Sequence, residues 1–214
     1  MARSNRVNGR LMRLVSLVLM CLAVCPAVAG RTVRDFFASE PGRVFPLLDK
    51  SSRLDMVDYF EAGKRVYPRT AMGTTSHIDT LTTSYIKLHT SDVREVALRM
   101  FTTKRDTVIA VLETIAIPAL DSRLTLYDRN WKPLPDKRQV KTPRIAQFIR
   151  PGTPQRIIDE LNDAVAFDVV EMRFEGDNFD NLVARHSLRQ FLTPQVWKTF
   201  APHLLDSIVV KLKF

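Results

Sequence analysis

Three acidic side chains recur at a spacing of three residues in one segment of the chain. Asp55, Asp58 and Glu61 would lie along one side of a helix. Two such carboxylates could bind Ca²⁺, or could act as a general acid and a general base. One helix face supplies few oxygen ligands, however, and no Asp-rich loop accompanies these residues. The pattern is more typical of a solvated helix face than of a reactive site.

The four histidines do not form a metal pair that is local in sequence. No two of His77, His89, His186 and His203 are two or four residues apart, the spacings that place two side chains on one face of a strand or helix. We expect His77 and His89 on surface strands. His186 falls on a predicted apolar strand face, which favours a histidine of the core. The alternative is a general base or a donor that binds ligand in a pocket.

Residues 131–156 combine positive charge with proline. Seven basic residues and five prolines stand there against the single acid Asp136, for a net charge of +6 in 26 residues. This composition predicts an extended, solvated connection between two subdomains. The alternative is a docking surface for an anionic component of the cell envelope. In that case Lys137, Arg138 and Lys141 are the candidate binding residues.

Motifs for covalent catalysis and for phosphate binding are missing from the sequence. There is no Gly-x-Ser-x-Gly, and the seven glycines are scattered rather than gathered in a phosphate-binding loop. Both cysteines, Cys21 and Cys25, lie near the N-terminus in a segment that we expect to be removed. We therefore predict no catalytic residue set, no metal site and no cofactor.

The first 29 residues have the three parts of a secretory signal. Four arginines precede an apolar stretch from Leu14 to Val24, and small residues at Ala27 and Ala29 predict cleavage after Ala29. An uncleaved anchor is disfavoured because a membrane span needs about 20 apolar residues. Cleavage lowers the net charge from +9 to +5, an excess too modest to favour a nucleic-acid partner. No later stretch is long and apolar enough to span a bilayer.

The elements that must position these residues begin with two helices. Thr32 can cap a short helix that runs through Ala38. Ser52 and Asp55 have the spacing of a capping box for a second helix, which Gly63 would end.

Alternating apolar residues then predict an antiparallel meander after a loop over Lys64–Thr75. The predicted strands are Tyr85–His89, Val93–Phe101, Val108–Ile117 and Arg123–Asp128. The third of them is almost continuously apolar, which is typical of a central strand covered on both faces.

The last third of the chain predicts a smaller α-β-β-α-β unit. Thr153-Pro154 and Thr193-Pro194 each place a capping residue before a proline at a helix start. Strands would follow at 169–174 and 182–188, joined by a hairpin loop over Gly176–Asn181, with a final strand at 209–214. The predicted fold class is α+β, with N-terminal helices packed on the meander. The predicted boundaries are a signal peptide at 1–29, a first subdomain at 30–131, a basic proline-rich connection at 132–152 and a second subdomain at 153–214.

Three stretches together resemble a known family. They are residues 52–58, the block from Asp121 to Leu134 with its Asp-Ser, Tyr-Asp and Trp residues, and the Leu-Thr-Pro at 192–194. With the predicted leader, the chain resembles an uncharacterised family of exported Bacteroidales proteins known as domain of unknown function 3256. The resemblance implies export and an envelope location in a Gram-negative anaerobe. It implies no activity and no catalytic residues.

Two functions compete at this point. The first is an exported envelope protein, in the periplasm or envelope, that binds a partner without catalysis, either another envelope protein or an anionic glycan. The second is a hydrolase of envelope material that uses Asp55, Asp58 and His186. The hydrolase hypothesis requires a cleft in which His186 and a carboxylate approach within about 4 Å.

Overall fold

The computed structural model describes most of the chain that follows the predicted leader. The described residues are 30–64, 73, 75–103, 106–116 and 118–212. The predicted signal peptide 1–29 and most of the predicted loop Lys64–Thr75 lie outside them.

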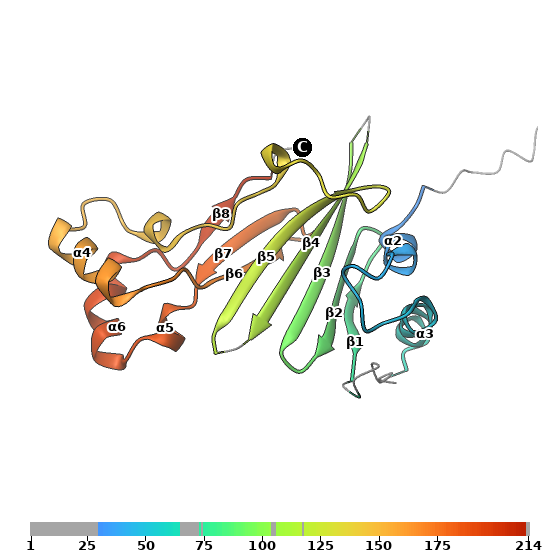
Figure 1. The fold of residues 1–214 in the computed structure, drawn as a ribbon, viewed down its shortest axis with the longest axis horizontal. Coiled ribbons are helices and arrows are strands. Elements are labelled where there is room, and N and C mark those ends of the chain that lie inside the picture. The colour runs from blue at the N-terminus through green and yellow to red at the C-terminus, as the bar shows by residue number, and fades with distance from the viewer. Residues whose placement is uncertain (1–29, 65–72, 74, 104–105, 117, 213–214) are drawn as a thin grey trace, which may run out of the picture. The chain divides into compact units, whose positions relative to one another are not determined.

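Five antiparallel strands form the larger sheet, in sequence order from edge to edge (Figure 1). They are β1 (His77–Leu81), β2 (Tyr85–Ser91), β3 (Arg94–Thr102), β4 (Thr107–Ala116) and β5 (Leu120–Asp128). The meander predicted from alternation and short connections is confirmed for β2 to β5. For β1 the sequence predicted only that His77 lies on a surface strand, and no bounds, because the segment His-Ile-Asp-Thr-Leu contains only two apolar residues.

Two helices cover one face of this sheet beside β1 and β2 (Figure 1). They are α2 (Val33–Ser39) and α3 (Lys50–Glu61). Phe36 and Phe37 of α2 and Met56 and Val57 of α3 pack against one alternating set of strand residues. That set comprises Ile86, Leu88, Val96, Leu98, Met100, Ile109 and Val111. Burial of these side chains supplies the hydrophobic free energy that holds the helices to the sheet.

The caps of the two helices agree with the sequence prediction in one case and not in the other. Thr32 caps α2, as predicted, and it forms a capping box with Asp35. The predicted Ser52 and Asp55 box of α3 is wrong. Asp49 caps that helix, and its Oδ1 accepts a hydrogen bond of 2.7 Å from the backbone N–H of Ser52. The capping aspartate lies three residues before Ser52, so the helix begins about one turn earlier than predicted, and the free N–H group that is satisfied is that of Ser52.

The smaller unit is a three-stranded antiparallel sheet with helices at its connections. Its elements are α4 (Gln155–Ala164), β6 (Val170–Glu175), β7 (Asn181–His186), α5 (Leu188–Phe191), α6 (Pro194–Phe200), the 3-10 helix η3 (Ala201–His203) and β8 (Ile208–Val210). The predicted order of helix, hairpin, helix and strand is confirmed. Thr193 caps α6 with Pro194 at its first position, as predicted, whereas Thr153 does not cap α4.

This smaller sheet packs on the face of the meander opposite α2 and α3. Val170, Met172 and Phe174 of β6 are buried together with the second alternating set of meander residues. That set comprises Tyr85, Ala97, Val108, Ala110, Leu112, Leu124 and Leu126. Strand β4 is therefore buried on both faces, which confirms the prediction from its apolar run.

Side chains of β5 also bind the backbone of β6 directly. The Ser122 Oγ accepts a hydrogen bond of 2.9 Å from the N–H of Met172, and an Asp121 carboxylate oxygen accepts one of 3.2 Å from the N–H of Val170. In return, the Ser187 hydroxyl donates to the Leu120 carbonyl at 2.6 Å. Asp121 and Ser122 are the first residues of the central block that carries the family resemblance. Their role in the structure is to join the two sheets.

The basic segment between the sheets is part of the core. It contains the 3-10 helices η1 (Asp136–Arg138) and η2 (Ile145–Phe148). The interpretation of this segment as solvated is wrong for Leu134, Ile145 and Phe148, which are buried in the same cluster as β6. A sequence composition dominated by lysine, arginine and proline hides these three anchors.

The described residues from Arg31 onward belong to one compact unit, and the predicted α+β class is confirmed. None of the helices among the described residues has the length and apolar character needed to cross a bilayer.

Candidate functional site

The residues of the hydrolase hypothesis do not meet. Asp55 and Asp58 lie on α3, which covers one face of the five-stranded sheet. His186 is the last residue of β7, which belongs to the three-stranded sheet on the opposite face of the meander. The body of the meander separates them, so the cleft that this hypothesis required is not formed.

The acidic side of α3 instead makes surface ion pairs. Arg34 of α2 reaches Asp58 and Glu61, each at 2.9 Å. Asp55 is exposed on the same helix. Exposed pairs of this kind contribute about 0–1 kcal/mol to stability. The structure thus agrees with the prediction of a solvated helix face.

His186 is enclosed by aromatic side chains. Its ring lies 5.3 Å from the Phe148 ring and 5.6 Å from the Trp197 ring, measured between centroids. Both of its ring nitrogens are shielded from solvent. Burial lowers the pKa of His186, against the opposing charge of Asp206. This environment favours a neutral core histidine rather than a general base.

The predicted basic binding residues lie on a segment that is fastened at several points. The Gln139 side chain accepts a hydrogen bond from the N–H of Leu126 at 2.8 Å and donates to the Leu126 carbonyl at 3.0 Å, so it satisfies the free edge of β5. Lys137 and Lys141 are exposed, and Arg138 is half-buried. None of the three forms an ion pair with an acidic residue in the described part of the chain.

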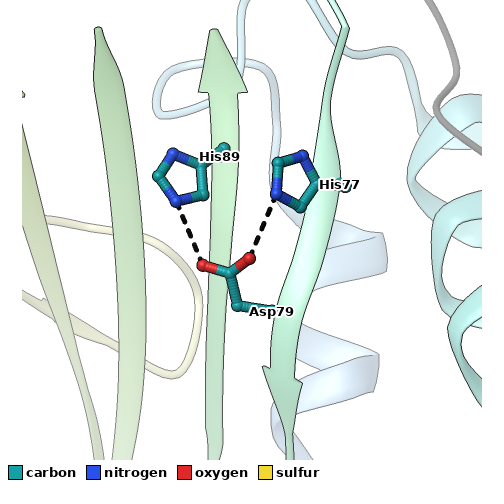
Figure 2. Close-up of side chains that lie close together, drawn as sticks. All are labelled: His77, Asp79 and His89. Atoms are coloured by element: carbon teal, nitrogen blue, oxygen red, sulfur yellow. Dashed lines mark ion pairs between the residues drawn. The ribbon is translucent and has the colours of Figure 1, made fainter. Parts of the chain in front are cut away.

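Sequence reasoning missed a cluster of side chains at the other edge of the meander, which we call the histidine cluster (His77, Asp79 and His89). His77 of β1 pairs directly with His89 of β2, and the ring centroids are 4.9 Å apart with an interplanar angle of 18°. A β-bulge follows, and it leaves Asp79 without an opposing residue. Figure 2 shows the Asp79 carboxylate with one oxygen toward a ring nitrogen of each histidine. One carboxylate oxygen lies 3.1 Å from His77 Nε2, and the other lies 3.1 Å from His89 Nε2.

Two further charged residues adjoin the histidine cluster. Lys87 Nζ lies 3.3 Å from Asp79 and 3.1 Å from Glu95, and Glu95 lies 3.6 Å from His89 Nε2. Burial lowers the pKa of Lys87, but the hydrogen bond and charge of Glu95 and the charge of Asp79 outweigh it, so the pKa is raised. Lys87 and Glu95 also line a pocket of about 270 Å³ that extends to Arg173 of β6.

The histidine cluster brings together donor atoms of the kinds that bind cations. The ligand atoms of His77, Asp79 and His89 all lie within 4.8 Å of one another, and no other such group occurs among the described residues. The search for histidine pairs along one strand missed it, because the second imidazole comes from the neighbouring strand. The available signal was the spacing His77-x-Asp79, which places an imidazole and a carboxylate two residues apart.

Comparison with known proteins identifies the fold and the family. Residues 26–213 match the profile of the family described as protein of unknown function (DUF3256). The solved structure of a domain of an uncharacterized protein from Porphyromonas gingivalis W83 is similar, with a TM-score of 0.72 and 24% identity over 85% of this chain and 95% of that chain. This second likeness bears on the fold alone. A search of the curated proteins gave no match. The family profile covers all of the described residues, and the chain belongs to the DUF3256 family, as the central Asp-Ser, Tyr-Asp and Trp block indicated.

Proposed function

We propose that this protein is an exported, non-catalytic binding protein of the cell envelope, and that its basic segment (residues 132–152) binds an anionic glycan. The observation that carries the proposal is the state of Lys137, Arg138 and Lys141. They lie close together along the chain, they form no ion pair with a described acid, and their backbone is fixed. The leader-like first 29 residues support export.

The charge state of the segment favours an external partner. Cations that are already paired have little to gain from a polyanion, because binding would break an existing contact. Arg34, Arg94 and Arg185, elsewhere in the molecule, are paired in this way. The basic residues from Lys132 to Arg150 are not paired with any described acid. Asp136 is the only acidic residue in this stretch of the sequence.

The attachment of the segment reduces the entropic cost of binding. Its N-terminal half is fastened to β5 through Gln139, and its C-terminal end is fastened by the N–H of Arg150, which donates to the His203 carbonyl at 2.8 Å. Leu134, Ile145 and Phe148 anchor it in the core. A backbone that is ordered before binding loses less conformational freedom when the ligand arrives. A glycan with regularly spaced carboxylates would meet several cations in one event.

The test is retention on an immobilised uronic-acid polysaccharide, with a neutral polysaccharide as the reference matrix. The combined variant Lys137→Ser, Arg138→Ser and Lys141→Ser should bind about threefold to a hundredfold more weakly, since each of the three lost contacts contributes about 0.2–1 kcal/mol. Its melting temperature should be almost unchanged, because these side chains make no ion pair with a described acid.

A matched control removes the same charge elsewhere. The combined variant Lys50→Ser, Lys64→Ser and Lys198→Ser alters three exposed lysines that also lack a described ion-pair partner. Retention of the control should stay close to that of the parent protein. The proposed role of the basic segment would be refuted if both variants were retained as well as the parent protein, or if both lost the same amount of retention.

A further inference from the structure

We propose that the histidine cluster is a binding site for a divalent transition-metal ion, and that Zn²⁺ is the ion it suits best. The three ligands come from two neighbouring strands, with His77 and Asp79 on β1 and His89 on β2. The site lies at the β1 edge of the meander, whereas the basic segment is fastened at the β5 edge, so the two proposals are independent.

The backbone fixes the positions of the ligands. The direct pairing of His77 with His89 places both imidazoles on one face of the sheet. Regular alternation along β1 would hold Asp79 one full repeat away from His77. The bulge between Ile78 and Thr80 changes this local geometry, and the carboxylate lies against both rings (Figure 2). Bulges commonly redirect a side chain beside a functional site.

The donor set selects the class of ion. Two imidazole nitrogens and one carboxylate oxygen suit Zn²⁺, Cu²⁺ or Ni²⁺. Ca²⁺ and Mg²⁺ prefer a shell made entirely of oxygen ligands, so two imidazoles disfavour them. A set of three protein ligands leaves one tetrahedral position for water or another group.

The distances require only small adjustments. With metal–ligand bonds of about 2.0–2.1 Å, neighbouring ligand atoms of a tetrahedral site are about 3.3 Å apart. The distance from each Nε2 to the nearer carboxylate oxygen is 3.1 Å, and no two ligand atoms of the cluster are more than 4.8 Å apart. Rotation of the imidazole rings would close the remaining gap. Side-chain exposures of 37% for His77, 23% for Asp79 and 34% for His89 leave a path for the ion.

Glu95 and Lys87 would modulate the affinity in opposite directions. Glu95 lies 3.6 Å from His89 Nε2 and can supply a fourth ligand or balance the charge of the ion. Lys87 lies 3.3 Å from Asp79, where its ammonium group would repel a divalent cation. An arrangement that served only as a network of ion pairs would depend on Lys87. In a metal site, removal of the Lys87 charge should raise the affinity for the ion. This difference distinguishes a metal site from a network of ion pairs.

The first experiment is a titration of the purified protein with Zn²⁺, followed by calorimetry, and with Co²⁺, followed by its visible ligand-field absorption. We expect one ion per chain and a rise in melting temperature with Zn²⁺ that EDTA reverses. His77→Ala and His89→Ala should each weaken binding by more than about tenfold. His203→Ala, which changes a histidine outside the cluster, should leave binding unchanged.

The second experiment uses Lys87→Met, which keeps the aliphatic stem and removes the charge. We expect Zn²⁺ to bind more tightly to this variant than to the parent protein. Far-ultraviolet circular dichroism in EDTA verifies that each variant is folded. The proposal is overturned if folded parent protein binds neither ion, if the double variant His77→Ala and His89→Ala retains the parent affinity, or if Lys87→Met weakens binding.

Discussion

The two faces of the five-stranded sheet are covered in different ways. On one face, α2 and α3 pack through aromatic and aliphatic side chains, and the caps that start these helices are local in sequence. On the other face, β6 is held by apolar packing and also by hydrogen bonds that its backbone N–H groups donate to Asp121 and Ser122, residues about fifty positions away. The basic segment closes this second face at the β5 edge and contributes Phe148 to its core.

This difference shows where function can reside in the fold. The helix-covered face is closed by packing, and its charged side chains pair with each other on the surface. The face covered by β6 has polar groups at its margins: the histidine cluster with Lys87 and Glu95 at one edge and the basic segment at the other. Both candidate binding sites therefore belong to the face whose covering depends on contacts between distant parts of the chain.

The largest effect expected is the loss of an aromatic side chain from either core. Phe148→Ala should lower the free energy of unfolding by about 3–5 kcal/mol, because the side chain is fully buried. Phe37→Ala on the opposite face should cost a similar amount, measured by chemical denaturation. The exposed Phe191→Ala is the control and should cost less than about 1 kcal/mol. A loss below about 1 kcal/mol for Phe148→Ala would show that the basic segment is a loosely attached connection after all.

A smaller effect is expected from the polar link between the sheets. Ser122→Ala removes the acceptor of the Met172 N–H and the partner of Thr114, whose Oγ lies 2.8 Å from the Ser122 Oγ. The buried groups left without a partner should cost about 1–3 kcal/mol in the same denaturation assay. Ser207→Ala, at an exposed position, should have no measurable effect. Equal stability of the two variants would mean that the hydrogen bonds of Ser122 do not contribute to the attachment of β6.

On the helix-covered face, the corresponding local feature is the cap of α2. Thr32→Ala removes the side chain that accepts from the Asp35 N–H, which should cost about 1 kcal/mol. Thr32→Ser keeps the hydroxyl and should restore most of that stability. If serine and alanine are equally destabilising, the lost methyl group rather than the cap is responsible.

The smallest effect is a dependence of stability on pH that arises from His186. Its pKa is lowered in the folded state by burial, so below a pH of about 6.5 the unfolded chain binds the proton more readily. Stability should therefore be complete above that pH and should fall as the pH drops toward the folded pKa. His186→Gln should reduce the slope of the unfolding midpoint between about pH 7.5 and 5. An unchanged slope would assign the dependence to other groups.

Sequence reasoning succeeded where a structural signal is local. The alternation of Val96, Leu98 and Met100 and the apolar run of β4 define strand faces directly, and Thr193-Pro194 marks the start of α6. The cap of α3 was misplaced because Asp49 and Ser52 lie three residues apart and both residue types are favoured as caps.

The remaining features arise from contacts that no local pattern encodes. The histidine cluster requires the register of β1 on β2 and a bulge at Asp79. The buried anchors of the basic segment are separated by charged residues and prolines, so they show no helical or strand period. The hypothesis that Asp58 and His186 meet was wrong for the same reason. The distance between them depends on which face of the sheet each element covers, and no local pattern encodes that choice.

The most direct test of the proposed binding function is the salt dependence of the affinity for a uronic-acid polysaccharide. Contacts made by exposed cations are screened by salt, so the parent protein should lose affinity steeply as NaCl is raised. The combined Lys137→Ser, Arg138→Ser and Lys141→Ser variant should show lower affinity and a clearly shallower salt dependence, while the control lacking Lys50, Lys64 and Lys198 should keep the parent slope. The same slope in all three proteins would contradict the assignment of glycan binding to the basic segment.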